Sequence, residues 1–213
     1  MPMTRSLLDL LRIEGIRRGL IHPDIQLDPA TVFRLVRDMP YQRASDRRPE
    51  TIIREWRGTC SGKHYLLAAL FRELGLNARV MAGVLRYEPD PKTTHPQLLA
   101  LLEPTEGVFV DVHNWVEIQL PDGSMSVDAT WPAFLKPYGF PVNEAFELGV
   151  SQPLAYPITK TYVVPEDQDP QTFKEQLLRS HFTPEELATR EAFIHALSHL
   201  LSGENQGGGQ SSP

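Results

Sequence analysis

The sequence contains a single cysteine, Cys60, among its 213 residues. One thiol cannot form a disulfide within the chain, so the fold must be held together by packing, and nothing indicates an oxidising compartment. Basic residues are also in the minority, because 21 Lys and Arg against 27 Asp and Glu give a formal net charge of −6. A chain of this charge without a clustered basic stripe is not expected to bind nucleic acid or an anionic membrane.

Long apolar runs are scarce as well. In the first 21 positions, Arg, Asp and Glu interrupt the apolar residues every few positions. This segment therefore has neither the apolar core of a signal peptide nor the length of a membrane span. We expect a cytoplasmic protein, and the oligomeric state is left open.

The sequence has no glycine-rich phosphate loop and no strong metal motif. His195 and His199 have the i, i+4 spacing that a metal site can use, but no glutamate stands at position 196 and no third ligand is near in sequence. Such a pair is more typical of a helix surface. We therefore expect no cofactor.

The residues that are present predict one α+β domain. Helical patterns come first, over 1–21, 27–40 and 60–75, strand patterns follow over 77–87 and 108–131, and a helical pattern returns over 181–203. Helices, then a sheet, then a late helix is an α+β order and not an alternating one. The expected organisation is a single domain over 1–202, with a core at about 30–131, a proline-rich loop region at 132–170, C-terminal helices at 171–202 and a disordered tail at 203–213.

Cys60 stands at the expected start of the central helix, directly after Gly58 and Thr59. At that place the unpaired backbone N–H groups and the positive end of the helix dipole favour the thiolate, which is the nucleophilic form. The same N–H groups could stabilise an oxyanion. The alternative is a buried packing cysteine, because free cysteine is among the most buried residue types.

A thiol nucleophile needs a base, and two histidines are candidates. His113 lies on a predicted strand over 108–120, on a face that mixes aromatic and ionisable residues. His64 lies one helical turn after Cys60, on a stripe that is otherwise apolar, where a neutral packing histidine is the expectation. We therefore favour His113 as the base.

The carboxylate that would orient His113 is less clear from spacing. The pair Asp122-Gly123 favours a tight hairpin turn, because it accepts positive φ. A two-residue turn there would set His113 opposite Pro132, so twist, a bulge or another register would be needed to bring Asp128 to His113. Spacing alone does not choose Asp128 over Asp111.

Four motifs, GTCSGKH, LNARVMAG, VHNWVEI and SVDATW, occur here in that order. Together they resemble the transglutaminase-like superfamily of papain-like cysteine enzymes, over roughly residues 30–131. The resemblance implies a papain-like fold in which the helix bearing the cysteine packs on an antiparallel sheet, with helices before and after this core. It also implies a triad of Cys60, His113 and Asp128.

A second oxyanion donor is not evident from the sequence. Tyr41, Gln42 and the indole N–H of Trp56 are candidates, and Trp115 is a candidate substrate-contacting residue beside His113. For Tyr41 and Trp56 taken singly, a buried aromatic side chain with a bonded polar tip is the plainer interpretation. Lys63 could support the thiolate or face water.

The expected activity is thiol-dependent acyl transfer or hydrolysis on a peptide, a protein or a small amide. Cys60 would attack the carbonyl, His113 would protonate the leaving amine, and water or an amine would resolve the thioester. The alternative is a catalytically silent peptide-binding or scaffolding module on the same fold.

Overall fold

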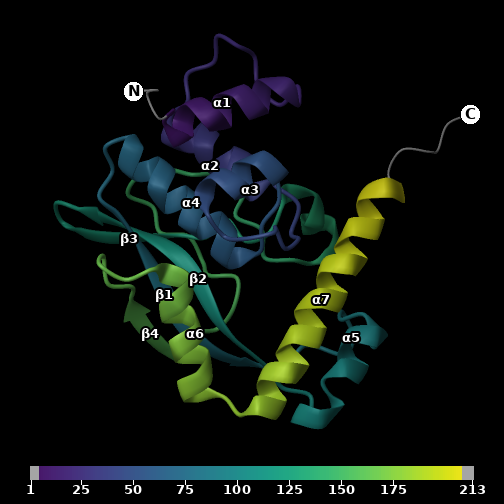
Figure 1. Ribbon diagram of the computed structural model, residues 1–213. Coiled ribbons are helices and arrows are strands. Elements are labelled where there is room, and N and C mark those ends of the chain that lie inside the picture. The colour runs from purple at the N-terminus through teal and green to yellow at the C-terminus, as the bar shows by residue number, and fades with distance from the viewer. Residues whose placement is uncertain (1–4, 208–213) are drawn as a thin grey trace, which may run out of the picture.

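The computed structural model describes residues 5–207 and has an α+β architecture (Figure 1), as the sequence predicts. The described helices and strands are α1 Leu7–Arg17, α2 Pro29–Arg37, α3 Pro49–Glu55, α4 Cys60–Glu73, β1 Ala78–Tyr87, α5 Pro96–Leu101, β2 Phe109–Leu120, β3 Gly123–Val127, β4 Lys160–Val163, α6 Pro170–His181 and α7 Pro184–Gly207. The strands form one antiparallel sheet in the order β3-β2-β1-β4.

The central helix α4 carries the site and packs on β1 and β2, with α1, α2 and α3 against its other sides (Figure 1). Most of its residues are buried. Close packing explains the glycine at position 58, just before the helix. A Cβ on Gly58 would lie 3.2 Å from Cγ and 3.3 Å from the backbone nitrogen of Lys63. Glycine thus lets the incoming chain run close to the first turn and set the position of Cys60.

The hairpin between β2 and β3 differs from the expected one. Leu120 pairs with Gly123, so the turn residues are Pro121 and Asp122 instead of Asp122 and Gly123. Gly123 adopts φ 150°, which glycine accepts readily, and it becomes the first paired residue of β3. The register therefore shifts by two residues, and this shift brings the chain after Val127 closer to His113.

The remainder of the chain builds a second apolar cluster. Phe109 at the start of β2 packs there with α5 and with Phe193, Ile194 and Leu197 of α7. The proline-rich region 132–170 contains a 3-10 helix, Ala133–Tyr138, and the edge strand β4. Figure 1 shows α7 running beside α5, at a distance from α1.

The helix α7 ends at Gly207, inside the segment 203–213 that was expected to be a disordered tail, and residues 208–213 lie outside the described residues. Among residues 5–207, no helix is both long and apolar enough to cross a membrane.

We predict that Gly83→Ala on β1 destabilises the protein by about 1–3 kcal/mol through overpacking. The added Cβ would lie 2.7 Å from Cζ3 of Trp115 and 2.7 Å from Cγ2 of Ile158. Chemical denaturation measures the change in the free energy of unfolding. The double variant Gly83→Ala/Trp115→Phe should be less destabilised than the sum of its single changes, and strict additivity would contradict this explanation.

Candidate active site

Cys60 is the first residue of α4 and is only 2% exposed. Its backbone N–H belongs to the first turn of the helix, where no partner exists within the helix. Burial by itself raises the pKa of the thiol, but the positive charge of Lys174 and hydrogen bonding to His113 outweigh it and lower the pKa to about 7. The sulfur thus lies in a dry, electropositive environment that favours the thiolate.

His113 comes from the middle of β2 and is fully buried. Its Nε2 donates to Oδ2 of Asp128 at 2.8 Å. Its Nδ1 has no partner in regular hydrogen-bond geometry among residues 5–207, so this is the ring nitrogen available to the Cys60 thiol. Burial lowers the pKa of His113, but Asp128 and Cys60 raise it to about 10, so the ring carries a positive charge.

Asp128 follows β3 directly and is held by several hydrogen bonds. The backbone N–H of Thr130 donates to Oδ1 at 2.9 Å, and that of Ala155 donates to Oδ2 at 2.8 Å. The Asp128 N–H itself donates to Oε1 of Gln152 at 2.9 Å. Although burial raises the pKa of Asp128, the charge of His113 holds it well below its usual range, so the carboxylate stays ionised.

Asp111, the other candidate partner of His113, belongs to a different ion-pair cluster. Nε of Arg190 donates to Oδ1 of Asp111 at 2.6 Å, and Nζ of Lys174 lies 3.4 Å from the same oxygen. Lys174 also donates to Oγ of Ser61 at 3.0 Å, next to Cys60. Asp111 therefore anchors two buried cations, and one of them acts on the thiol.

Both ring nitrogens of His64 bond main-chain groups, which indicates a structural role. Its Nδ1 lies 2.7 Å from the carbonyl oxygen of Cys60, and its Nε2 accepts from the backbone N–H of Ala129 at 2.8 Å. This pair of contacts requires the neutral tautomer with the proton on Nδ1, and burial lowers the pKa of His64 to about 4. His64 thus ties the start of α4 to the chain just after Asp128.

Lys63 does not face water, in contrast to one of the two sequence-based interpretations, and its Nζ makes its hydrogen bonds to main-chain oxygens. It is fully buried, and its Nζ donates to the carbonyl oxygens of Arg37 at 2.7 Å and Thr130 at 3.1 Å. Burial lowers its pKa to about 7. Lys63 therefore joins the end of α2, the first turn of α4 and the segment after β3.

The four candidate substrate or oxyanion residues lie in different places. Tyr41 is buried against Trp131, with ring centroids 4.7 Å apart, and burial followed by the nearby Cys60 thiolate raises its pKa well above the ordinary value. Gln42 and Trp56 instead line a separate surface hollow. Trp115 lies nearly parallel to the His113 ring, at a centroid distance of 6.2 Å and an angle of 16°. Tyr41 is thus a candidate donor whose pKa depends on the charge of the Cys60 thiolate.

The sequence patterns did not reveal three contributors, Lys174, Tyr156 and Trp131. Tyr156 packs edge-on against His113 at 5.6 Å, and Trp131 lies 6.0 Å from Tyr156. Lys174 sits in an ordinary amphipathic helix pattern, and Tyr156 lies in a proline-rich segment without periodicity. Of these three residues, only Trp131 belongs to one of the sequence motifs, because SVDATW ends on it.

Within residues 5–207, no three His, Cys, Asp or Glu side chains gather as a metal site would require. The exposed residues His195 and His199 lie on α7.

We predict opposite effects for the two histidines. His113→Ala should raise the Cys60 pKa, because the imidazolium beside the sulfur is lost, and ultraviolet absorbance of the thiolate measures this. His64→Ala should mainly lower stability, by about 1–3 kcal/mol, because two buried backbone groups lose their partner. A Cys60 pKa that rises in His64→Ala and not in His113→Ala would reverse the assignment.

We predict that Lys174→Met raises the Cys60 pKa by roughly one unit, a tenfold change in acid dissociation. Lys174 supplies the largest favourable charge at the sulfur, while Arg190 still pairs with Asp111 in this variant. The matched control is Arg179→Met on the same helix, whose side chain is 77% exposed. Equal thiolate titrations in both variants would rule out the influence of Lys174.

Comparisons with known proteins identify the core of the chain. Residues 30–129 match the family model of the transglutaminase-like superfamily, and this segment contains Cys60, His113 and Asp128. No curated protein and no solved structure gives a significant match. The resemblance predicted from the four sequence motifs is confirmed: residues 30–129 match the transglutaminase-like superfamily.

Proposed function

We propose that the protein is a cysteine-dependent enzyme that hydrolyses or transfers the acyl group of an amide, with Cys60 as nucleophile, His113 as acid and base, and Asp128 as the residue that orients His113. One observation carries the proposal: buried His113 binds Asp128 through Nε2 at 2.8 Å and leaves Nδ1 for the Cys60 sulfur. The Cys60 pKa of about 7 and the His113 pKa of about 10 favour a thiolate–imidazolium pair. A packing cysteine has no need of such a pair.

The first half of the reaction would begin with attack of the Cys60 sulfur on the amide carbonyl carbon. The carbonyl oxygen becomes an oxyanion, which the N–H groups of the first turn of α4 can stabilise. Tyr41 stays protonated and can donate a second hydrogen bond. As the C–N bond breaks, His113 gives its Nδ1 proton to the leaving amine, and a thioester remains on Cys60.

In the second half, neutral His113 removes a proton from water or from an amine, which attacks the thioester. Collapse of this intermediate releases a carboxylic acid or a new amide and restores the thiolate–imidazolium pair. Hydrolysis is the simpler outcome, because water needs no acceptor site. Asp128 keeps its charge throughout and stabilises the imidazolium.

A second candidate function is a peptide-binding or scaffolding module. The burial of Cys60 favours it, because a sulfur that is 2% exposed must be uncovered before a substrate can reach it. Alkylation of the native protein separates the two functions. Modification of Cys60 by iodoacetamide at pH 6, faster than that of a model thiol with a pKa of about 8.5, supports the enzyme. Modification that needs denaturation supports the module.

We predict that turnover of members of a peptide and amide library rises with pH through about 7, as Cys60 ionises, and falls through about 10, as His113 loses its proton. Cys60→Ala should abolish amine release and keep the native melting temperature. Detection of released amines by mass spectrometry measures the turnover. Full activity of a correctly folded Cys60→Ala variant would refute the proposed nucleophile.

A further inference from the structure

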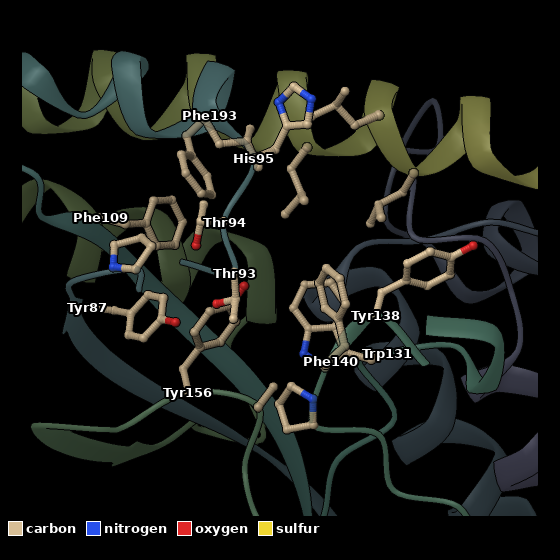
Figure 2. Close-up of a pocket in the computed structure, with 18 of the residues that line it drawn as sticks. Tyr87, Thr93, Thr94, His95, Phe109, Trp131, Tyr138, Phe140, Tyr156 and Phe193 are labelled. Atoms are coloured by element: carbon tan, nitrogen blue, oxygen red, sulfur yellow. The ribbon is translucent and has the colours of Figure 1, made fainter. Parts of the chain in front are cut away.

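A cavity of about 450 Å³ lies beside the candidate active site (Figure 2). Seven aromatic side chains line it: Tyr87, Phe109, Trp131, Tyr138, Phe140, Tyr156 and Phe193. Figure 2 shows Tyr87, Phe109 and Tyr156 on one side of the cavity and Trp131 and Phe140 across from them. Leucines of α7 close a further wall, and Lys92, Thr93 and Thr94 bring polar groups to the lining. The volume falls within the range of small-molecule sites.

Two residues connect this cavity to the triad. The Tyr156 ring lines the cavity and contacts the edge of His113, with centroids 5.6 Å apart. Ala155 also lines the cavity, and its backbone N–H donates to Oδ2 of Asp128 at 2.8 Å. A molecule bound in the cavity is therefore separated from His113 by the thickness of one side chain.

One residue of the lining, Trp131, carries an unpaired donor. The indole Nε1 of Trp131 is buried and has no hydrogen-bond partner within the described part of the chain. Buried polar groups are normally paired, so this N–H is a donor that the described residues leave free.

We propose that this cavity binds a bulky aromatic group attached to the amide that the active site processes. The inference rests on the proposed function for the amide chemistry of the substrate. It rests on the cavity for the size and shape of the attached group. Rings in T-shaped and tilted pairs line the walls, and such walls offer both edges and faces to another ring. An aliphatic chain would gain only the burial of its surface.

Binding is measured with full-length Cys60→Ala protein, so that it does not depend on turnover. The probes are N-(2-naphthylmethyl)acetamide, its isomer N-methyl-2-naphthylacetamide, N-(cyclohexylmethyl)acetamide and N-methylacetamide. At least one naphthyl probe should bind at least about tenfold more tightly than N-methylacetamide, as expected for burial of a large ring, and more tightly than the cyclohexyl probe. Equal dissociation constants for all probes overturn the inference.

The position of the bound ring is tested with neighbouring residues of α7. Leu200 is half-buried and lines the cavity, whereas His199 is exposed and does not. Leu200→Trp should fill part of the cavity and weaken naphthyl binding by about tenfold, while His199→Trp should leave it unchanged. Thr94→Trp, in the lining segment before α5, provides a second blocking variant if Leu200→Trp does not fold. Undiminished binding by the folded blocking variant contradicts this location.

Turnover by the wild type distinguishes the two sources of the ring and the two proposals. Preferred hydrolysis of N-(2-naphthylmethyl)acetamide places the ring on the amine side of the scissile bond, and preference for its isomer places it on the acyl side. Ring-dependent binding without turnover of either probe keeps the cavity assignment and counts against the proposed activity. Turnover with no preference for an aromatic ring keeps the activity and overturns the cavity assignment.

Discussion

The buried attachment of the first turns of α4 to the segment after β3 is the constraint on which the rest of the site depends. Lys63 and His64, neighbours on α4, bond main-chain groups of Thr130 and Ala129, and His64 also bonds the carbonyl oxygen of Cys60. Cys60 lies on one side of this connection and Asp128 on the other. The side chains of Lys63 and His64 are fully buried, so leaving their polar groups without partners would cost stability. The connection therefore has few alternative geometries. This connection thereby limits the distance between Cys60 and Asp128 independently of their contacts with His113.

The electrostatics of Cys60 depend on residues far away in the sequence. A buried thiol resists ionisation, so a pKa of about 7 requires positive charge nearby. His113 supplies part of it from the core, and Lys174 supplies part from α6, outside the family match over 30–129. Asp111 holds Lys174 in place and also pairs with Arg190 of α7. The C-terminal helices therefore complete the surroundings of Cys60, His113 and Asp128, which all lie within the family match.

The same helices also shape the space around the site. The helix α7 packs along α5 and supplies Phe193 and the leucines that line the aromatic cavity, while the segment after β3 brings Tyr156 over His113. Cys60 itself is buried, so its sulfur can be reached only after neighbouring side chains move. The lining of the cavity and the cation that acts on the thiol thus come in part from segments outside the family match.

The sequence by itself determined the α+β order, the start of the central helix at Cys60 and the place of His113 on a strand. These features depend on local signals, which are the spacing of apolar residues and the motif around the cysteine. The family motifs added Asp128, but hairpin spacing left Asp111 open, because sliding a two-residue turn by one position along the chain moves the register by two positions. Tertiary structure decided that Asp128 meets His113, that Lys63 bonds carbonyl groups, and that Lys174 and Tyr156 reach the site from distant segments. The physical reason is that ion pairs, cavities and strand register arise from contacts between residues far apart in the chain, and no local period records them.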